Sequence, residues 1–349
     1  MPAGDIHWPV FTWGIMGKDQ KSKIICGDAL ASLQELPDGI VRCCVTSPPY
    51  WGLRDYGVDA QLGLERTPEE YTAKMVEVFR EVRRVLADDG TLWLNLGDTY
   101  AANRSYQVTD NKHINVGNNH GSSVPPGLKP KDLVGIPWTV AFALRADGWY
   151  LRHGIIWSKP NPMPESVTDR PTTSHEYVFL LSKAARYFYN AEAIKEPGVW
   201  AGQDRNTIDP IPSHMPGDPP PQRGLRIRDK QRGHSRRHAG FNDRWDAMTK
   251  EQQCCESRNR RSVWEIATQP FPGAHFAVMP EALVEPCILA GSAPGDLVLD
   301  PFSGSGTVGL VALRGLRRFI GIELNPDYCA MAERRLEEYS QQEELFYEG

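Results

Sequence analysis

A glycine-rich turn between an apolar strand and a helix sets the strongest limit on how this chain folds. The segment LVLD (297–300) has the composition of a buried strand, and the turn FSGSGT follows it. A second strand pattern, 318–323, comes after the helix and ends in Glu323, which lies 19 residues beyond Gly304. A strand–turn–helix–strand order builds a parallel sheet, and glycine lets the backbone approach a ligand closely. We therefore expect an α/β fold with a binding site at this turn.

The same turn indicates the class of ligand. An acidic residue about 20 positions after the glycines suits the two hydroxyls of a ribose. The turn has neither the GxGxxG spacing of dinucleotide sites nor the lysine of triphosphate-binding loops. A nucleoside-type cofactor without phosphates is therefore expected, and S-adenosylmethionine (SAM) is such a cofactor.

Alternating strand and helix patterns fill much of the remaining chain. A helix is expected at 67–86, where Thr67 is the N-cap, Pro68 is the first helical residue and Glu70 completes a capping box. Further strand patterns occur at 23–26, 40–46, 91–96, 150–157, 176–182 and 187–190, and further helix patterns at 29–36, 131–146, 280–292, 308–315 and 326–340. This rhythm predicts one α/β domain with a seven-stranded, mostly parallel sheet and helices on both faces.

Composition narrows the setting in which the chain works. No apolar run approaches the ~18 residues of a membrane span. Seven cysteines without a CxxC pair argue against a disulfide framework and a metal site, and they indicate the reducing cytoplasm. Cys287 lies within an apolar helix pattern, so it is expected in the core and not as a nucleophile. His175 and Glu176 open a strand pattern, where ordinary packing is expected over a pocket-lining role.

Positive charge is concentrated in one segment of an otherwise acidic chain. The formal net charge is −5, yet residues 195–262 hold 14 Lys and Arg against 9 Asp and Glu. Such a segment is either a solvated insertion or a contact with nucleic acid, whose phosphates its cations neutralise. The candidate DNA-contacting residues are Arg54, Arg223, Arg226, Arg228, Lys230, Arg232, Arg236 and Arg237.

A second motif, Ser47-Pro48-Pro49-Tyr50, follows the strand pattern 40–46. Its two prolines stop the strand and stiffen the loop. The arrangement suits methyl transfer to an exocyclic amine, whose lone pair is delocalised into its ring. Hydrogen bonds from that amine to the Ser47 hydroxyl and the Pro48 carbonyl would free the lone pair, while Tyr50 offers a face for a flipped base. The alternative is a plain Pro-Pro turn without chemistry.

Together the motifs TSPPYWGLRDYG and DPFSGSGT resemble the DNA amino-methyltransferases, which methylate adenine N6 or cytosine N4 with SAM. The SPPY motif comes early, the basic segment follows and the SAM motif comes late, which is similar to the permuted order of the β class of that family. The resemblance runs from about residue 23 to residue 338. It implies a SAM-dependent, Rossmann-like methyltransferase fold in circularly permuted order, with an inserted recognition segment.

The resemblance also implies a division of the chain and a role for each motif residue. The division is an N-terminal arm (1–22), a catalytic half (23–194), a target-recognition segment (195–262) and a SAM-binding half (263–349). Ser47, Pro48, Pro49 and Tyr50 would form the catalytic loop. Glu323 is expected at the ribose and Asp28 at the adenine amine. The other residues expected at the cofactor are His275, Phe276, Asp300, Phe302, Ser303, Gly304, Ser305, Gly306, Thr307 and Asn325.

The target base and the partners have alternatives. Serine in the first motif position is the habit of cytosine-N4 enzymes, but adenine-N6 enzymes are more numerous in this class, and adenine N6 is the prediction. The other hypotheses are an RNA amino-methyltransferase and a catalytically inactive regulator that binds SAM and DNA. The expected partners are double-stranded DNA with a flipped base, a second copy in a homodimer and a cognate restriction endonuclease, without membrane contact.

Overall fold

The computed structural model describes residues 20–52, 61–101, 124–198, 257–269 and 278–347. The chain divides into two compact units, Met1–Ala193 with Arg261–Gly349, and Ile194–Arg260. Within the second unit, the short strands β6 (Glu196–Pro197) and β7 (Ser257–Arg258) pair antiparallel. Most of the predicted recognition segment lies outside the described residues, so its role stays a prediction.

The first unit is built on an eight-stranded sheet with the strand order β1-β10-β9-β2-β3-β5-β4-β8. Its strands are β1 (Ser22–Cys26), β2 (Val41–Thr46), β3 (Leu86–Leu96), β4 (Tyr150–Ser158), β5 (His175–Ser182), β8 (Val263–Glu265), β9 (Leu297–Asp300) and β10 (Arg318–Glu323). β5 runs antiparallel to both of its neighbours, and the other neighbouring strands are parallel. The predicted α/β class and mostly parallel sheet are confirmed.

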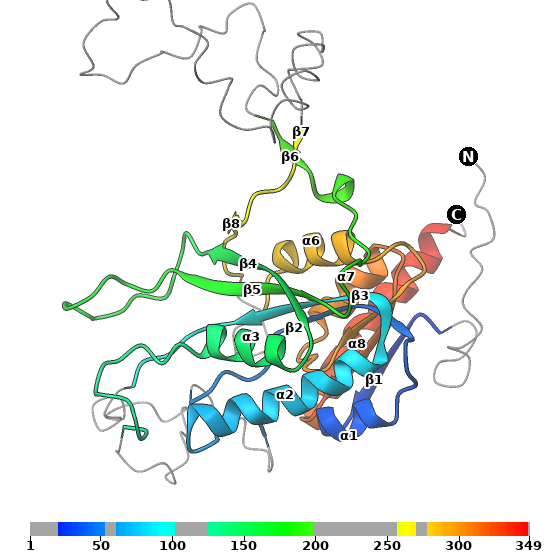
Figure 1. The fold of residues 1–349 in the computed structure, drawn as a ribbon. Coiled ribbons are helices and arrows are strands. Elements are labelled where there is room, and N and C mark those ends of the chain that lie inside the picture. The colour runs from blue at the N-terminus through cyan, green and yellow to red at the C-terminus, as the bar shows by residue number, and fades with distance from the viewer. Residues whose placement is uncertain (1–19, 53–60, 102–123, 199–256, 270–277, 348–349) are drawn as a thin grey trace, which may run out of the picture. The chain divides into compact units, whose positions relative to one another are not determined.

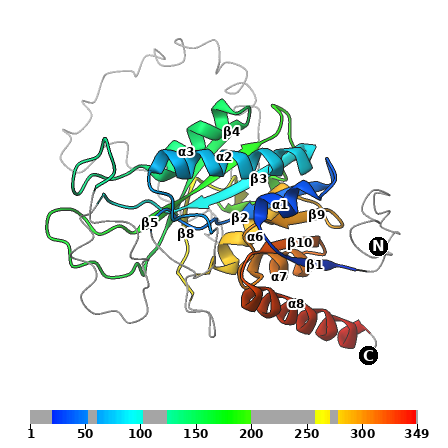
Figure 2. The same cartoon turned by 90° about the horizontal axis from the view of Figure 1, so that it is seen from below.

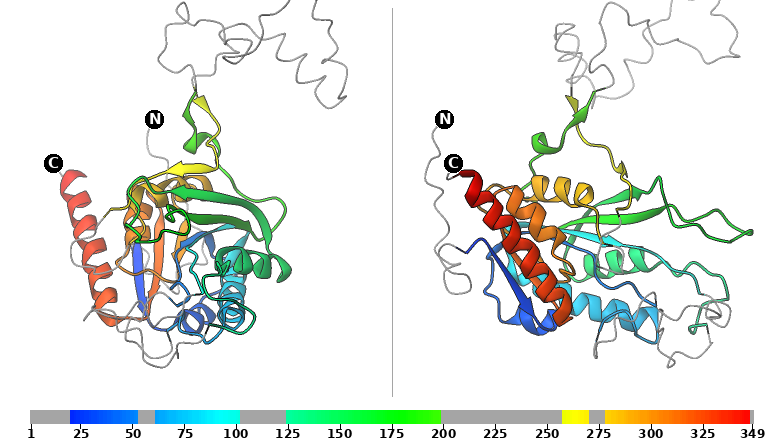
Figure 3. Two further views of the ribbon diagram at one scale, coloured as in Figure 1. Left: turned by 90° about the vertical axis from the view of Figure 1, so that its left-hand side faces the viewer. Right: turned by 180° about the vertical axis from the view of Figure 1, so that it is seen from behind.

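Helices cover both faces of this sheet, as the strand–helix rhythm predicts. They are α1 (Ala29–Gln34), α2 (Pro68–Val85) and α3 (Ile136–Ala146) on one face, and α6 (Glu281–Gly291), α7 (Thr307–Arg314) and α8 (Pro326–Tyr347) on the other (Figure 1 and Figure 3). Figure 2 shows α2 between α1 and α3, with α6, α7 and α8 on the other side of the strands.

The strand count differs from the predicted seven because of β8. This strand is three residues long and pairs parallel with the end of β4. Three residues are too few for an alternating pattern to predict a strand. The strand predicted at 187–190 is wrong, because that stretch is irregular. Its backbone hydrogen bonds go from Phe188 to Asp89 and from Asn190 to Ala290, both at 2.9 Å.

α2 begins where its sequence predicts. Thr67 Oγ1 accepts the Glu70 N–H at 3.1 Å, and Pro68 is the first helical residue. The Glu70 carboxylate accepts the Arg66 N–H at 3.0 Å, whereas a capping box would use the Thr67 N–H. One face of this helix is buried in the core through Tyr71, Met75, Val78, Phe79 and Val82.

β2 and β9 join the early and late parts of the chain at the centre of the sheet. Cys43 and Cys44 of β2 lie beside Val298 and Leu299 of β9 in parallel register. At the carboxyl ends, Thr46 Oγ1 donates to Asp300 Oδ1 at 2.6 Å, and the same oxygen accepts the Phe302 N–H at 3.0 Å. Because the strands are parallel, the SPPY loop and the glycine turn leave the sheet at the same edge.

A glycine in α7 allows tight packing against the sheet and α8. A methyl group on Gly309 would lie 2.6 Å from the buried Phe319 ring and 3.1 Å from Leu336. We expect Gly309→Ala to lower the free energy of unfolding by about 1 kcal/mol, because overpacking costs roughly 1–3 kcal/mol and alanine's helix propensity returns up to ~1 kcal/mol of that cost. Urea unfolding measures this change. In a Phe319→Leu background the same substitution should cost less, and equal costs in both backgrounds would contradict the packing explanation.

Asp300 gives the fold a predictable dependence on pH. Burial, aided by the negative charge of Glu323, raises the pKa of Asp300 to about 7, although the hydrogen bonds from Thr46 and Phe302 oppose the shift. The folded chain therefore binds a proton at Asp300 between its ordinary pKa of 3.8 and about 7. The stability that this proton contributes is complete below the ordinary pKa and is lost as the pH rises through the folded value.

We expect Asp300→Asn to remove this dependence, because the asparagine carbonyl can accept both hydrogen bonds without carrying a charge. The unfolding free energy of the wild-type protein should fall relative to that of the variant between about pH 5 and about pH 8. Urea unfolding at both pH values measures the difference, and a difference that is constant with pH would refute the assignment.

Candidate active site

One open cavity of about 820 Å³ joins the two predicted motifs. Its lining includes Gly27 and Asp28 after β1, the SPPY loop after β2, the glycine turn after β9, and Glu323 at the end of β10. Parallel strands bring all these carboxyl ends to the same edge of the sheet. The volume falls within the roughly 300–1,000 Å³ of small-molecule sites. Residues predicted from separate motifs therefore line one cavity.

The glycine turn has a backbone conformation that other residues rarely adopt. Gly304 has a φ of +51° and Gly306 a φ of +78°. A methyl group on Gly304 would enter open space, whereas one on Gly306 would lie 3.0 Å from Ala332 of α8. Gly304, Phe302 and Thr307 line the cavity. Gly304 thus brings the backbone to the cavity, while Gly306 allows α7 to pack against α8.

Glu323 holds the glycine turn in place. Its Oε2 accepts the Gly304 N–H at 2.8 Å, and its Oε1 accepts the Asn325 N–H at 2.9 Å. Burial raises the pKa of Glu323 above its ordinary value. A carboxylate can accept about four hydrogen bonds, so each oxygen retains capacity for a ligand hydroxyl. This geometry fits the contact with a ribose that the sequence predicts.

Two buried serine hydroxyls of the turn have no hydrogen-bond partner among the described residues. They are Ser303 Oγ and Ser305 Oγ. Ser303 Oγ faces Gly321, where a methyl group would lie 2.6 Å from it. Ser305 also lines the cavity. Buried polar atoms are almost always paired, so an orphaned hydroxyl in a cavity wall fits a ligand that supplies the partner.

The other predicted cofactor residues have local roles as well. Asp28 Oδ1 accepts the Ala31 N–H at 2.9 Å at the start of α1, and Asn325 Oδ1 accepts the Asp327 N–H at 2.9 Å at the start of α8. Both Asp28 and Asn325 line the cavity. The Asp300 carboxyl is occupied by its bonds within the sheet edge. Outside the described residues lie His275, Phe276, Arg54, Arg223, Arg226, Arg228, Lys230, Arg232, Arg236 and Arg237.

The SPPY loop is held by residues outside the motif. Tyr71 of α2 donates its hydroxyl to the Pro49 carbonyl at 2.9 Å. Trp51, which is buried, donates its indole N–H to the Glu65 carbonyl at 3.0 Å. These anchors add to the stiffness of the two prolines, so the loop is a preformed wall of the cavity.

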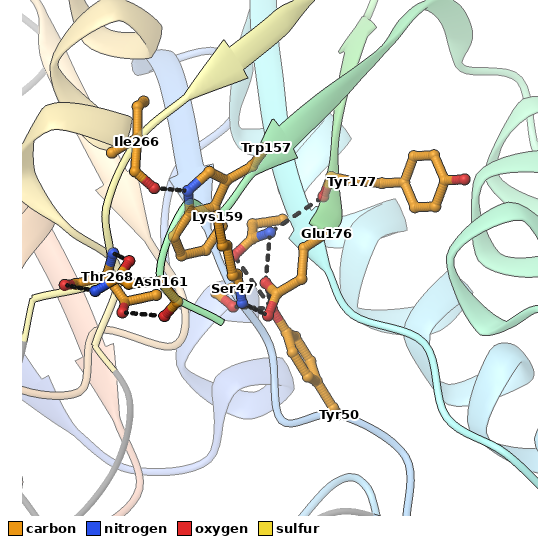
Figure 4. A network of polar contacts seen from close by, with 10 residues as sticks. Ser47, Tyr50, Trp157, Lys159, Asn161, Glu176, Tyr177, Ile266 and Thr268 are labelled. Carbon is orange, nitrogen blue, oxygen red and sulfur yellow. Dashed lines mark hydrogen bonds and ion pairs between the residues drawn. The ribbon is translucent and has the colours of Figure 1, made fainter. Parts of the chain in front are cut away.

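The Tyr50 hydroxyl belongs to a cluster of polar side chains (Figure 4). It donates to Glu176 Oε2 at 2.7 Å, lies 3.1 Å from Asn95 Oδ1 and accepts from Ser47 Oγ at 3.2 Å. Burial, followed by the negative charge of Glu176, raises the pKa of Tyr50 well above its ordinary value. The Tyr50 ring lies against Gly97, where a methyl group would be 2.7 Å from the ring. Tyr50 is thus fixed both by its ring and by its hydroxyl.

The sequence did not predict Asn95, Lys159 or Glu176 as site residues. Lys159 forms an ion pair with Glu176 Oε1, and both side chains are 17% exposed. Asn95 Nδ2 donates to Glu176 Oε2 at 3.2 Å. Ordinary packing is the expectation for His175 and Glu176, but both residues line the cavity, although His175 also packs edge-on against Tyr177. The sequence signal that could have found Lys159 is its position as a charged residue directly after the strand β4.

The segment after β8 secures the loop that carries Lys159. Trp157 Nε1 donates to the Ile266 carbonyl at 2.8 Å. The Asn161 side chain and the Thr268 backbone exchange two hydrogen bonds of 2.9 and 3.2 Å (Figure 4). The short strand β8 therefore matters to the site, because it brings this segment alongside β4.

Two alternative chemistries receive no support from the described residues. Cys287 is 1% exposed in α6 and its thiol donates to the Leu283 carbonyl at 3.3 Å, which confirms it as a core residue. No group of three or more His, Cys, Asp or Glu in the described ranges could hold a metal ion. Likewise, none of the described helices is long and apolar enough to cross a membrane.

The chain is similar along most of its length to known DNA-modifying enzymes. It is 47% identical over 312 residues to the Type II methyltransferase M.Cfr9I of Citrobacter freundii, covering 89% of this chain and 86% of that one. It is 46% identical over 315 residues to the Type II methyltransferase M.SmaI of Serratia marcescens, covering 90% of both.

Solved structures share the fold. One is a DNA modification methylase of Thermus thermophilus complexed with S-adenosyl-L-methionine, with a TM-score of 0.54, 24% identity and coverage of 91% of this chain and 94% of that one. Another is the cytosine-N4-specific PvuII DNA methyltransferase, with a TM-score of 0.57, 18% identity and coverage of 92% and 91%. The model of the N6/N4 DNA methylase family matches residues 41–334. With the Type II relatives, this match shows that the chain belongs to that family, the site-specific DNA amino-methyltransferases.

Proposed function

We propose that this chain methylates the exocyclic amino group of a base flipped out of duplex DNA, with SAM as the cofactor. The observation that carries the proposal is the single cavity lined by both the glycine turn and the SPPY loop. Methyl transfer needs the cofactor and the amine in contact with each other, and a shared cavity meets that need. SAM supplies a methyl group that its positively charged sulfur has already activated.

The cofactor end of the cavity has the groups that SAM requires. Glu323 offers carboxylate oxygens to the ribose hydroxyls, and Asp28 offers one to the adenine amine. Ser305 Oγ is a buried hydroxyl without a partner in the described part of the chain. The backbone at Gly304 leaves open space for the ligand. Two carboxylates at this end suit a cofactor that carries positive charge and no phosphate.

The base end has the groups that make an aromatic amine reactive. The Ser47 hydroxyl and the Pro48 carbonyl accept hydrogen bonds from the amine and draw it towards a tetrahedral shape, in which its lone pair can attack. Because the loop is already held by Tyr71 and Trp51, these acceptors need no rearrangement. Transfer is direct and inverts the methyl group, and no covalent enzyme intermediate forms.

Cytosine N4 is the target that we propose, with adenine N6 as the alternative. The observation that favours cytosine is Ser47 itself, because serine in the first motif position is the habit of cytosine-N4 enzymes. The number of adenine enzymes in the class, on which the prediction of adenine rested, says nothing about this pocket. A residue in contact with the amine is a better guide to the base.

The remaining predictions about partners belong to the same proposal. The basic segment 195–262 would bind duplex DNA, because its cations neutralise phosphates. We also propose that the chain forms a homodimer, that it works with a cognate restriction endonuclease and that it is located in the cytoplasm. Equilibrium sedimentation that shows a monomer with and without DNA would remove the dimer from the proposal.

Nucleoside analysis tests both the activity and the base. Purified protein is incubated with tritiated SAM and unmethylated genomic DNA, and the digested nucleosides are identified by mass. We expect N4-methylcytosine. N6-methyladenine would reassign the base and keep the activity. Bound SAM without any transfer to DNA would overturn the proposal and direct the same assay to RNA.

Gly304→Ala tests the cofactor end. Alanine is strained at a φ of +51°, and its methyl group enters the cavity space that the cofactor needs. We expect SAM to bind at least about 10-fold more weakly by calorimetry, which corresponds to roughly 1.4 kcal/mol. Gly39→Ala is the matched control, because Gly39 has a φ of +71° and open space around it but does not line the cavity. Equal weakening by both variants would contradict the assignment.

A further inference from the structure

The proposed reaction leaves a proton that the SPPY loop itself cannot hold. Attack of the amine on the methyl group moves positive charge from sulfur to nitrogen, and the methylated nitrogen must then lose a proton. The loop offers a hydroxyl and a carbonyl, neither of which is a base. A carboxylate joined to the loop would be a suitable acceptor.

Glu176 is joined to the loop by a continuous chain of hydrogen bonds. Ser47 Oγ donates to the Tyr50 hydroxyl at 3.2 Å, and the Tyr50 hydroxyl donates to Glu176 Oε2 at 2.7 Å. Both donors point in the same direction, from the site of the amine to the carboxylate. Figure 4 shows Tyr50 and Lys159 converging on Glu176, with Ser47 beside them.

The contacts of Glu176 fix its carboxylate and leave Oε2 facing the Tyr50 hydroxyl. Lys159 pairs with its other oxygen, Oε1, so the carboxylate is held without using up the oxygen that Tyr50 contacts. Asn95 bridges Glu176 and the Tyr177 carbonyl, at 3.2 and 3.1 Å. Lys159 Nζ itself lies 4.3 Å from the centre of the Trp157 ring. Removing an ion pair from water costs free energy, so a mostly buried pair in a cavity wall is a candidate functional group.

Tyr50 has the properties of a residue that relays a proton from Ser47 to Glu176. Its phenol resists ionisation, because burial and the charge of Glu176 raise its pKa. It therefore passes a proton on only as it receives one. The hydroxyl both accepts, from Ser47, and donates, to Glu176, which is what a relay requires.

We propose that Glu176 is the proton acceptor of the reaction and that Ser47 and Tyr50 relay the proton to it, an inference that rests on the proposed function. The amine nitrogen forms its bond to the methyl carbon, and the carbon–sulfur bond breaks with its electron pair on sulfur. The nitrogen then gives a proton to Ser47 Oγ, Ser47 gives its own to Tyr50, and Tyr50 gives its own to Glu176 Oε2. Glu176 becomes a neutral acid. The positive charge that left the product then remains on Lys159, whose carboxylate partner has been neutralised.

Lys159 and Asn95 are positioning residues in this scheme, because Lys159 holds Glu176, and Asn95 holds both Glu176 and the Tyr50 hydroxyl, without taking up the proton. After the product leaves, Glu176 returns its proton to water in the open cavity. The ionisable groups packed against Glu176 in the described residues include Tyr50 and Lys159, and His175 is its neighbour in β5.

Two substitutions at Glu176 separate the relay from a purely structural role. Glu176→Gln keeps an oxygen that accepts from Tyr50 but cannot take up a proton, whereas Glu176→Ala removes both functions. A relay predicts that both variants slow single-turnover methyl transfer by about 10²-fold. Formate should restore much of the rate of Glu176→Ala, and neutral formamide should not. If Glu176 merely positions Tyr50, Glu176→Gln keeps the wild-type rate and formamide rescues Glu176→Ala as well as formate does.

Controls keep the outcomes distinct. SAM affinity and the thermal unfolding midpoint are measured for each variant, and Asp38→Asn, which removes the exposed surface partner of Arg84, should keep the wild-type rate. Should the Glu176 variants not fold, Tyr50→Phe keeps the ring, breaks the relay and should lose the same rate without rescue by formate. A wild-type rate for Tyr50→Phe would overturn the relay. A wild-type protein that transfers no methyl group to DNA would instead overturn the proposed function.

Discussion

The parallel pairing of β2 with β9 holds the SPPY loop and the glycine turn together at one edge of the sheet. These strands come from opposite ends of the chain, yet Cys43 and Cys44 lie beside Val298 and Leu299. The bond from Thr46 to Asp300 extends the pairing to the point where both strands end. Without this contact, the glycine turn and the SPPY loop would be two separate loops. With it they are two walls of one cavity, and the burial of Asp300 is the cost of joining them.

The cavity has two ends with different electrostatics. At the proposed cofactor end, Glu323 is held by the N–H groups of Gly304 and Asn325, which leave its charge available to a ligand. At the end where we propose that the base binds, Glu176 forms an ion pair with Lys159 and a hydrogen bond with Tyr50. Two carboxylates in one cavity thus differ because of their partners, one facing backbone N–H groups and the other an ammonium and a phenol. Environment separates the roles of otherwise similar groups.

Local signals in the sequence predicted what local interactions decide. Thr67 caps α2, Cys287 packs in α6, and Gly304 bends the backbone at the cavity, each from a pattern within a few residues. Local sequence does not predict the packing role of Gly306, because the residue that it lies against, Ala332, belongs to a different helix. The strand β8 is a similar case, since its three residues become a strand by lying next to β4.

The α/β class, the two motifs and the chemistry that each motif suits follow from the sequence alone, because the residues within a motif are covalent neighbours and their geometry is local. Only the three-dimensional arrangement of the strands brought Glu176 and Lys159 into the cavity wall beside the SPPY loop. That outcome depends on β5 running antiparallel between β3 and β4, which brings its amino end to the edge where β4 ends. The direction of a strand is set by its pairing with distant segments, and no pattern within the strand records it.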